Sequence, residues 1–150
     1  MSEENKAIDA RMALEAFNKG RLEVVDEVIA ANFVDHAQLP PGVPAGKEGV
    51  KALIGALRSA FPDMKVTIER QIAEGDLVVQ HVSAAGTMTG DFAGMPASGK
   101  HARWEAIHIS RFADGKVVEH WSVQDQLGML QQLGFVPTPE AAAEPVGAKH

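Results

Sequence analysis

The chain of 150 residues contains no cysteine and no tyrosine, and only 5% of its residues are aromatic. Without cysteine there is no disulfide, no thiolate nucleophile and no cysteine-based metal site. Without tyrosine, no phenol is available as an acid or as a hydrogen-bond donor to an oxyanion. These two absences exclude several kinds of catalytic site before any motif is considered.

Long hydrophobic runs and an excess of positive charge are missing as well. No apolar stretch reaches the roughly 18 residues needed to span a bilayer, and none near the N-terminus resembles a signal peptide. The formal net charge of −6 provides no electrostatic attraction to nucleic acid or to an anionic membrane. We therefore expect a cytoplasmic protein with no nucleic-acid or membrane partner.

What is present is typical of one globular domain. Hydrophobic residues make up 45% of the chain and charged residues 23%, and 150 residues can bury a sizeable core. The last fourteen residues, PTPEAAAEPVGAKH, carry no periodic hydrophobic pattern. We expect a single domain over residues 1–136 and a flexible C-terminal tail over residues 137–150.

Hydrophobic periodicity predicts helices first and strands afterwards. Helical spacing covers residues 4–18, 22–29, 47–61 and 126–133, and strand-like patterns cover residues 64–73, 76–87, 101–112 and 117–123. Residues 39–46 and 90–100 are rich in glycine and proline and are expected to be loops. Helices followed by a run of antiparallel strands indicate the α+β class.

The Asp-Gly dipeptide at 114–115 predicts a tight hairpin turn. An unbroken ladder from that turn pairs Trp121 with His108 and Asp125 with Trp104. Side chains of a strand alternate between the two faces of a sheet. The face shared by these residues would then carry Trp104, Ala106, His108, Trp121, Val123 and Asp125. A carboxylate, an imidazole and both tryptophans on one face indicate a lined pocket.

The opposite face of the same hairpin is also apolar, because Ile107 and Ile109 point away from the predicted pocket. A sheet that is apolar on both faces needs cover on both. We expect helices on one face and, as a hypothesis, a second copy of the chain on the other. This predicts a homodimer.

Several motifs together resemble a known family. They are Phe33-Val34-Asp35-His36, the Gly46-x-Glu48-Gly49 segment, GTMTGDFAGMPASGK at 86–100, RFADGKVVEHWSVQD at 111–125, and Gln132-Leu133-Gly134. In this order they resemble the SnoaL-like polyketide cyclases, or ester cyclases, of the nuclear transport factor two-like superfamily. The similarity extends over residues 7–136.

The resemblance implies a cone-shaped fold, in which a curved, mostly antiparallel sheet wraps around N-terminal helices as in a cystatin-like α+β barrel. A ligand cavity would open at one end. Family cyclases close a ring of an aromatic polyketide by intramolecular aldol condensation, without metal or cofactor. Their acid/base carboxylate maps onto Asp125. The family often has histidine where Met88 stands and arginine where His81 stands.

Asp125 is therefore the first catalytic candidate. Beside Trp104 in a dry pocket, desolvation would raise the pKa of its carboxyl towards neutrality, where acid/base exchange is efficient. The alternative is a structural role, because aspartate is a common N-cap and the last predicted helix begins at Gln126.

Histidines and large apolar side chains complete the predicted site. His108 would polarise a carbonyl at the far end of the ligand, and His36 would lie at the rim, both as catalytic candidates. Trp104, Trp121, Met88 and, if the register of its strand allows, His81 would line the substrate pocket. The alternative for His108 and the two tryptophans is packing in the core, and for His36 a solvated loop.

No pair of histidines has metal-ligand spacing on one element with a carboxylate, so no metal is expected. The resemblance to the cyclases implies that no cofactor is needed. The predicted partner is a small hydrophobic or aromatic carbonyl compound. Related isomerase, hydrolase or dehydratase activities and a non-catalytic binding module stay open. A cavity of about 300 Å³ or more, with Asp125 in its wall, would favour an enzyme.

Overall fold

The computed structural model describes residues 2–138. The predicted tail therefore lies, apart from residues 137–138, outside the described residues. The elements in chain order are α1 (Ser2–Arg11), η1 (Met12–Phe17), α2 (Glu23–Val28), β1 (Ile29–Asp35), α3 (Gly46–Ala60), β2 (Lys65–Glu74), β3 (Leu77–Thr87), β4 (His101–Ala113), β5 (Lys116–Gln124) and α4 (Gln126–Leu133). The α+β prediction is confirmed.

The helices begin and end close to the predicted residues. The first helical segment runs through α1 and η1, with a π-helical last part, and the chain leaves it at Gly20, whose φ is +71°. Helix α3 carries an apolar stripe that buries Ile54 completely, and it ends just before Pro62. Proline cannot continue a helix, because it lacks the N–H donor and clashes with the preceding turn.

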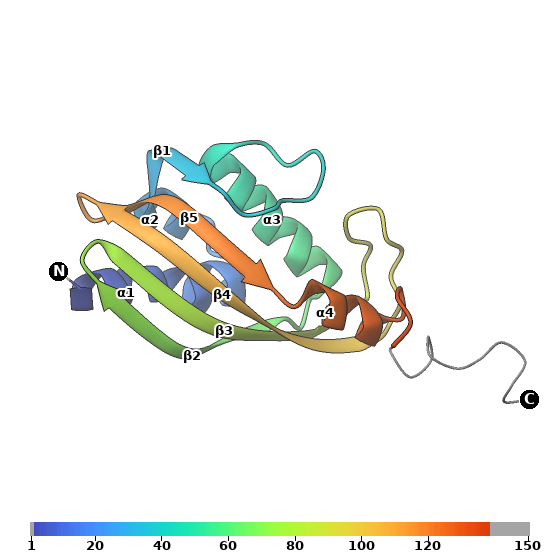
Figure 1. The fold of residues 1–150 in the computed structure, drawn as a ribbon. Coiled ribbons are helices and arrows are strands. Elements are labelled where there is room, and N and C mark those ends of the chain that lie inside the picture. The colour runs from blue at the N-terminus through green and yellow to red at the C-terminus, as the bar shows by residue number, and fades with distance from the viewer. Residues whose placement is uncertain (1, 139–150) are drawn as a thin grey trace, which may run out of the picture.

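The five strands form one mixed sheet in the order β1-β5-β4-β3-β2. Strands β2 to β5 pair antiparallel with their neighbours in the chain, whereas β1 runs parallel to β5. Figure 1 shows the twisted strands with helices α1, α2 and α3 on one side, which we call the inner face. Helix α4 lies at the end of the sheet where β5 stops.

Strand β1 was not predicted. Val25, Val28 and Ile29 fit a helical spacing, so the sequence pattern merges the end of α2 with the start of β1. The strand forms because it finds a partner about 85 residues later in the chain, with Val34 opposite Glu119 and Asp35 opposite His120. Local periodicity carries no information about such a distant partner.

The predicted register of the β4–β5 hairpin is wrong beyond its first two pairs. Phe112 pairs with Val117 as expected, but the next pair is Arg111 with Glu119, because Val118 is an extra residue in a β-bulge. Both Val117 and Val118 are buried. A shift of one residue turns every later side chain of the strand to the opposite face.

Two groups of buried side chains fill the space between the inner face and the helices. One surrounds α2 and includes Val24, Val25, Val28, Ile54, Val78 and Phe112. The other lies towards α4 and includes Phe61, Met88, Trp104, Met129 and Leu133. The cavity described below also lies between the sheet and the helices.

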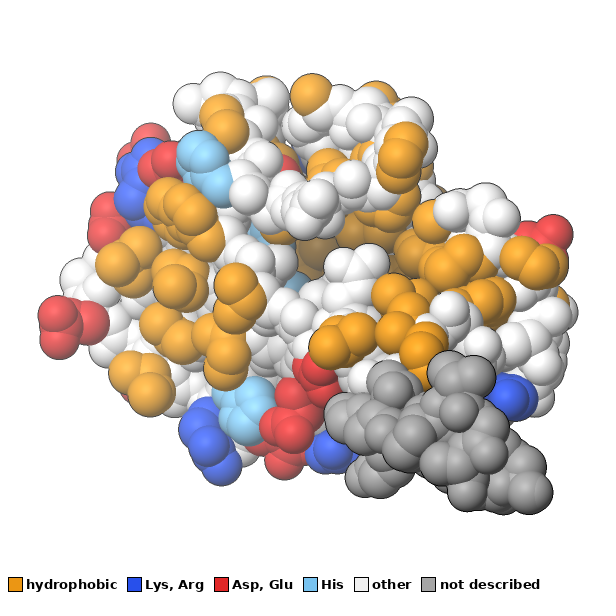
Figure 2. Space-filling model, turned by 45° about the vertical axis from the view of Figure 1, so that its right-hand side comes forward, with side chains coloured by type: hydrophobic (Ala, Val, Ile, Leu, Met, Phe, Trp, Pro, Cys, Tyr) orange, Lys and Arg blue, Asp and Glu red, His pale blue; other side chains and the backbone are white. Residues whose placement is uncertain are grey.

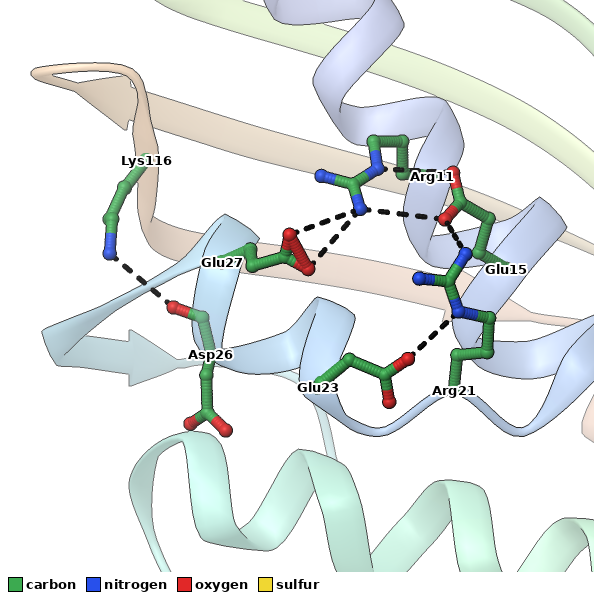
Figure 3. A network of polar contacts seen from close by, with 7 residues as sticks. All are labelled: Arg11, Glu15, Arg21, Glu23, Asp26, Glu27 and Lys116. Carbon is green, nitrogen blue, oxygen red and sulfur yellow. Dashed lines mark hydrogen bonds and ion pairs between the residues drawn. The ribbon is translucent and has the colours of Figure 1, made fainter.

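Ion pairs tie the N-terminal helices together at the surface (Figure 3). Arg11 contacts Glu15 at 3.0 Å and Glu27 at 3.3 Å, which joins α1 to α2. Lys116, at the start of β5, donates to the carbonyl oxygen of Asp26 in α2. Pairs as exposed as these contribute little to stability individually, so they orient the helices more than they stabilise them.

Across residues 2–138 there is no helix of the length and apolar character required to pass through a membrane.

Candidate functional site

A cavity of about 580 Å³ lies between the inner face of the sheet and the helices. Its lining is mostly apolar and includes Phe17, Phe33, Leu53, Leu57, Trp104 and Met129. The loops at residues 37–41 and 92–95 and the start of α4 also contribute to the lining. Figure 2 shows its mouth as a hollow with hydrophobic walls. A space of this size accommodates a ligand of several fused rings.

Three side chains from three adjacent strands form a hydrogen-bonded chain in the cavity wall. His120 Nδ1 lies 2.8 Å from Asp35 Oδ1, and His120 Nε2 lies 2.9 Å from His108 Nδ1. Asp35 comes from the end of β1, His120 from β5 and His108 from β4, and all three line the cavity. The bulge at Val118 is what brings His120 to this face.

The surroundings fix the charge of both ends of this chain. Partial burial would raise the pKa of Asp35, but the hydrogen bond from His120 and the nearby imidazole charge outweigh it, so that the pKa is lowered. Burial, with a smaller contribution from the charge of His120, lowers the pKa of His108 to about 4. At neutral pH, Asp35 is therefore ionised and His108 is neutral.

With Asp35 ionised, His120 donates its Nδ1 proton to the carboxylate and accepts from His108 Nδ1–H at Nε2. Nε2 of His108 then carries a lone pair and makes no hydrogen bond to any residue in the described range 2–138. A proton taken up at that atom can pass as an Nδ1 proton to His120, next to the carboxylate. The arrangement is that of a base supported by a relay.

A second polar pair lies beside the first. Ser110, the next residue of β4 on the inner face, donates from Oγ to Asp9 Oδ1 of α1 at 3.1 Å. Burial raises the pKa of Asp9 to about 6, although the Ser110 hydrogen bond and the charge of His120 partly oppose the rise. Asp9 is thus a carboxyl group that exchanges a proton near neutrality.

The third polar group of this wall is Gln80, which pairs with His108 across β3 and β4. It is 5% exposed and lines the cavity, and its Nε2 is buried with no hydrogen-bond partner. Buried polar atoms of this kind are rare, because each costs the desolvation of the group.

Two of the predicted site residues lie where the sequence placed them. His108 and Trp104 both line the cavity, and Trp104 also packs on Phe61, with ring centroids 5.5 Å apart. Met88 is fully buried in the second core group and is not part of the cavity lining, so its predicted place in the pocket is wrong.

Three others lie on the outer face of the sheet, away from the cavity. Trp121 pairs with Ile109 instead of His108, and its ring stacks on His36 at 5.0 Å. His36 is exposed and bonds to Glu119 at 2.9 Å. His81 bonds to Glu105 on this face, because β3 and β4 pair in the register that places His81 opposite Ile107. The predicted pocket position of Trp121 and the predicted rim position of His36 are therefore wrong, and the register that His81 required does not occur.

Asp125 is exposed, and its predicted position in a dry pocket is wrong as well. Its Oδ1 accepts a hydrogen bond from the backbone N–H of Gly128 at 2.9 Å, which caps helix α4. The carboxylate lies in a shallow depression of about 220 Å³ on the outer side, next to His81 and Glu105. Its acid/base role stays a prediction.

Sequence reasoning missed Asp9, Asp35, His120 and Gln80 as cavity residues. For Asp9 a signal was available, since it shares the helical spacing of the buried residues Asn5, Ala13 and Ala16. The position of Asp35 depends on β1, and that of His120 depends on the β-bulge at Val118. No local sequence signal was found for either feature. Gln80 depends on the register between β3 and β4, which no tight turn sets.

Within residues 2–138, no group of three or more histidine, cysteine, aspartate or glutamate side chains is arranged to hold a metal ion.

The family model of SnoaL-like polyketide cyclases matches residues 8–133. The chain belongs to this family. It is 33% identical to the nogalonic acid methyl ester cyclase of Streptomyces nogalater over 120 residues, which cover 79% of this chain and 90% of that one. It is also 33% identical to an aklanonic acid methyl ester cyclase of Streptomyces peucetius over 133 residues, covering 87% and 92%.

Solved structures agree with this membership. The structure of TsrD from Streptomyces laurentii superposes with a TM-score of 0.81 at 28% identity, covering 89% of this chain and 97% of the other. The structure of a SnoaL-like protein from Jannaschia sp. CCS1 superposes with a TM-score of 0.79 at 26% identity, covering 91% of this chain and 95% of the other, so the fold is shared within the family.

Proposed function

We propose that this SnoaL-like protein closes a ring in a polyketide-like substrate by an intramolecular aldol reaction, with His108 as the base. The observation that carries the proposal is the Asp35–His120–His108 chain, which ends in the wall of a large apolar cavity. A base with a relay, inside a water-poor cavity, is what enolisation of a carbonyl compound requires.

The names of the relatives and the lining of the cavity support a proposal for the substrate class. The similar cyclases are named for nogalonic and aklanonic acid methyl esters. A volume of about 580 Å³ with walls such as Trp104, Phe33 and Leu57 suits a planar, largely apolar compound of that kind. We propose an aromatic polyketide ester with an enolisable carbonyl group as the substrate.

The reaction is an isomerisation, so no atoms are gained or lost. His108 Nε2 removes a proton from the carbon next to one carbonyl group, and the resulting enolate carbon attacks a second carbonyl carbon of the same molecule. A carbon–carbon bond forms, the π bond of the second carbonyl breaks, and its oxygen becomes an alkoxide. The proton then returns to that oxygen and gives the alcohol.

The relay explains how a histidine with a low pKa can act as a base. Burial disfavours a charge on His108 itself. When His108 accepts the substrate proton at Nε2, it can hand its Nδ1 proton to His120, where the ionised Asp35 stabilises the imidazolium. The positive charge therefore comes to rest beside a carboxylate instead of in the apolar wall.

A matched pair of variants tests the proposal. We expect His108→Gln to slow conversion of aklanonic acid methyl ester or nogalonic acid methyl ester by about 100- to 10,000-fold, the usual contribution of a general base. His81→Gln, on the outer face, should stay within about twofold of wild type. Conversion is followed by chromatography, since the product has the mass of the substrate.

Asp125→Asn belongs in the same experiment. If Asp125→Asn loses activity and His108→Gln does not, the base is Asp125 and the proposal fails. If the wild-type protein binds these esters without converting them, the chain is a binding module on the same fold.

The outer face supports a second proposal, that two copies of the chain pair through their sheets. Register neighbours Ile72, Val79, Ile109 and Trp121 form an apolar row across four strands, and Ile72 is 61% exposed. Figure 2 shows hydrophobic side chains gathered over this face, at the left. Arginines and glutamates flank the row and are paired with one another within the chain.

Sedimentation of wild type and of Ile72→Glu tests this homodimer. We expect a dimer for wild type and a monomer for the variant, whereas a monomeric wild type at micromolar concentration would refute it. A cytoplasmic location stays a prediction. The absence of nucleic-acid and membrane partners is also a prediction, which the net charge of −6 supports.

A further inference from the structure

Among the described residues, Gln80 alone has a fully buried side-chain nitrogen or oxygen atom, Nε2, without a hydrogen-bond partner. Ser110 is bonded to Asp9, His120 to Asp35, and Gln71 on the neighbouring strand donates to the carbonyl oxygen of Lys6. The amide of Gln80 makes no hydrogen bond to any residue between 2 and 138, and its Nε2 is buried. A buried amide without a partner is unfavourable unless something else satisfies it.

The position of this amide indicates what would satisfy it. Gln80 lines the cavity, and it lies directly opposite His108 in the β3–β4 ladder. Side chains of directly opposed residues start about 4.5 to 5.5 Å apart on the same face. A ligand group held at His108 is therefore also within reach of Gln80.

We propose that Gln80 is the oxyanion donor of this site: its amide N–H donates to the carbonyl oxygen next to the carbon that loses its proton to His108. The proposal rests on the proposed function and assigns a further residue to the same reaction. A carbonyl oxygen and its α-carbon are only two bonds apart, so neighbouring side chains can hold one and deprotonate the other. In the observed rotamer Nε2 is buried behind the cavity surface. A half-turn of the amide interchanges its N and O, which turns the N–H towards the cavity and places the oxygen in the buried position.

The charges of the wall favour a neutral donor at this position. As the proton leaves, negative charge moves onto the carbonyl oxygen, and Asp35 is ionised nearby. His120 separates that carboxylate from His108, whereas Gln80 lies directly beside His108. A neutral amide supplies a donor at any pH and adds no charge to an apolar wall. Donors placed where charge develops stabilise the transition state strongly.

Gln80→Met tests the assignment, because methionine keeps the length of the side chain and removes the donor. We expect kcat for the ester substrate to fall about 10- to 100-fold with little change in KM, as for loss of a donor that acts mainly in the transition state. Gln71→Met is the matched control. It removes the same amide from the neighbouring strand, where the side chain is already paired with α1, and should leave kcat within about twofold.

A binding experiment separates this inference from the proposed function. 2-Naphthol presents an aromatic ring with an ionisable oxygen, and its absorbance reports whether that oxygen is charged. We expect the pKa of the bound naphthol to be about one unit, or tenfold in ionisation constant, higher in Gln80→Met than in wild type. Gln71→Met should match wild type.

The outcomes are distinct. If wild type shows no turnover but the naphthol pKa depends on Gln80, the aldol function fails and the oxyanion donor stands. If kcat and the naphthol pKa are unchanged in Gln80→Met, or if wild type does not bind naphthol, Gln80 is not the donor. A purely structural role would shift the melting temperature of Gln80→Met and leave the naphthol pKa unchanged, which also overturns the assignment.

Discussion

The two faces of the sheet carry the same kinds of side chain in opposite surroundings. On the inner face, Asp35, His120 and His108 are bonded in a chain along an apolar cavity. On the outer face, His36 is bonded to Glu119 and His81 to Glu105, and both pairs have partners open to solvent. Histidine next to a carboxylate is thus found on both sides.

The two faces differ in how deeply these ionisable side chains are buried. The pKa of His108 is lowered to about 4 because the wall excludes water, and the pKa of Asp9 is raised to about 6 for the same reason. Solvent-exposed pairs are screened and contribute little. A histidine–carboxylate pair therefore indicates a reactive site only together with burial. On the inner face the pair lies in a cavity of about 580 Å³, whereas His81 and Glu105 on the outer face lie in a shallow depression of about 220 Å³.

Of the differences that we expect between the two faces, the largest is in catalytic activity. Asp35→Asn removes the charge that stabilises the imidazolium of His120, and it should lower turnover of the ester substrates by about 100-fold or more. Glu119→Gln removes the corresponding carboxylate of the outer face and should stay within about twofold. Steady-state kinetics of both variants measure this difference. Equal losses of turnover would show that the two faces do not differ in function.

The two tryptophans should differ in how much each contributes to the free energy of unfolding. Trp104 is 6% exposed and packs against Phe61, so Trp104→Ala should lower the free energy of unfolding by about 3 to 5 kcal/mol. Trp121 is partly exposed and stacks on His36, so Trp121→Ala should cost about 1 kcal/mol in the isolated subunit. Urea unfolding measures both, and a larger loss for Trp121→Ala would contradict the observed register.

Asp9 should make stability depend on pH. Its pKa rises from 3.8 to about 6 on folding, so the folded state holds its proton more tightly. The stability that this provides is present below pH 4 and is lost as pH rises to about 6, by about 3 kcal/mol. Asp9→Asn, which keeps an acceptor for Ser110, should be more stable than wild type at pH 7 and similar at pH 4.

Urea unfolding at the two pH values measures this difference. Glu119→Asp, which keeps the charge on the outer face, is the control and should follow the wild-type pH dependence. A constant difference between Asp9→Asn and wild type would show that the Asp9 carboxyl does not titrate with a raised pKa.

The smallest expected effect concerns Asp125. Asp125→Ala removes the cap of helix α4 and should lower the free energy of unfolding by about 1 kcal/mol, with Asp125→Asn restoring most of the loss. Thermal unfolding measures both variants. A loss of turnover in Asp125→Asn without a loss of stability would instead support its predicted acid/base role.

Comparison of sequence and structure shows where prediction succeeds. The boundaries of α3, α4 and strands β2 to β4 follow within one residue from hydrophobic spacing, from Pro62 and from the Asp-Gly turn at 114–115. His108 and Trp104 were placed correctly, because β4 alone decides which of its residues share a face. These features depend on short segments of chain.

The errors share one physical cause. A single extra residue, Val118, moved His120 into the cavity and turned Trp121 out of it. The register between β3 and β4 likewise places Gln80 on the inner face and His81 on the outer face. Because side chains in a strand repeat every two residues, a shift of one residue reverses every assignment beyond it.

The sequence by itself determined the class of fold, the family and the presence of acid/base residues on the β4–β5 hairpin, since spacing and turn chemistry are local. The tertiary structure alone decided which acids and histidines meet. Asp9, Asp35 and His120 come together through a parallel strand pair, a bulge and a helix packed across the sheet. The energies that fix those contacts act between residues far apart in the chain, and no local pattern records them.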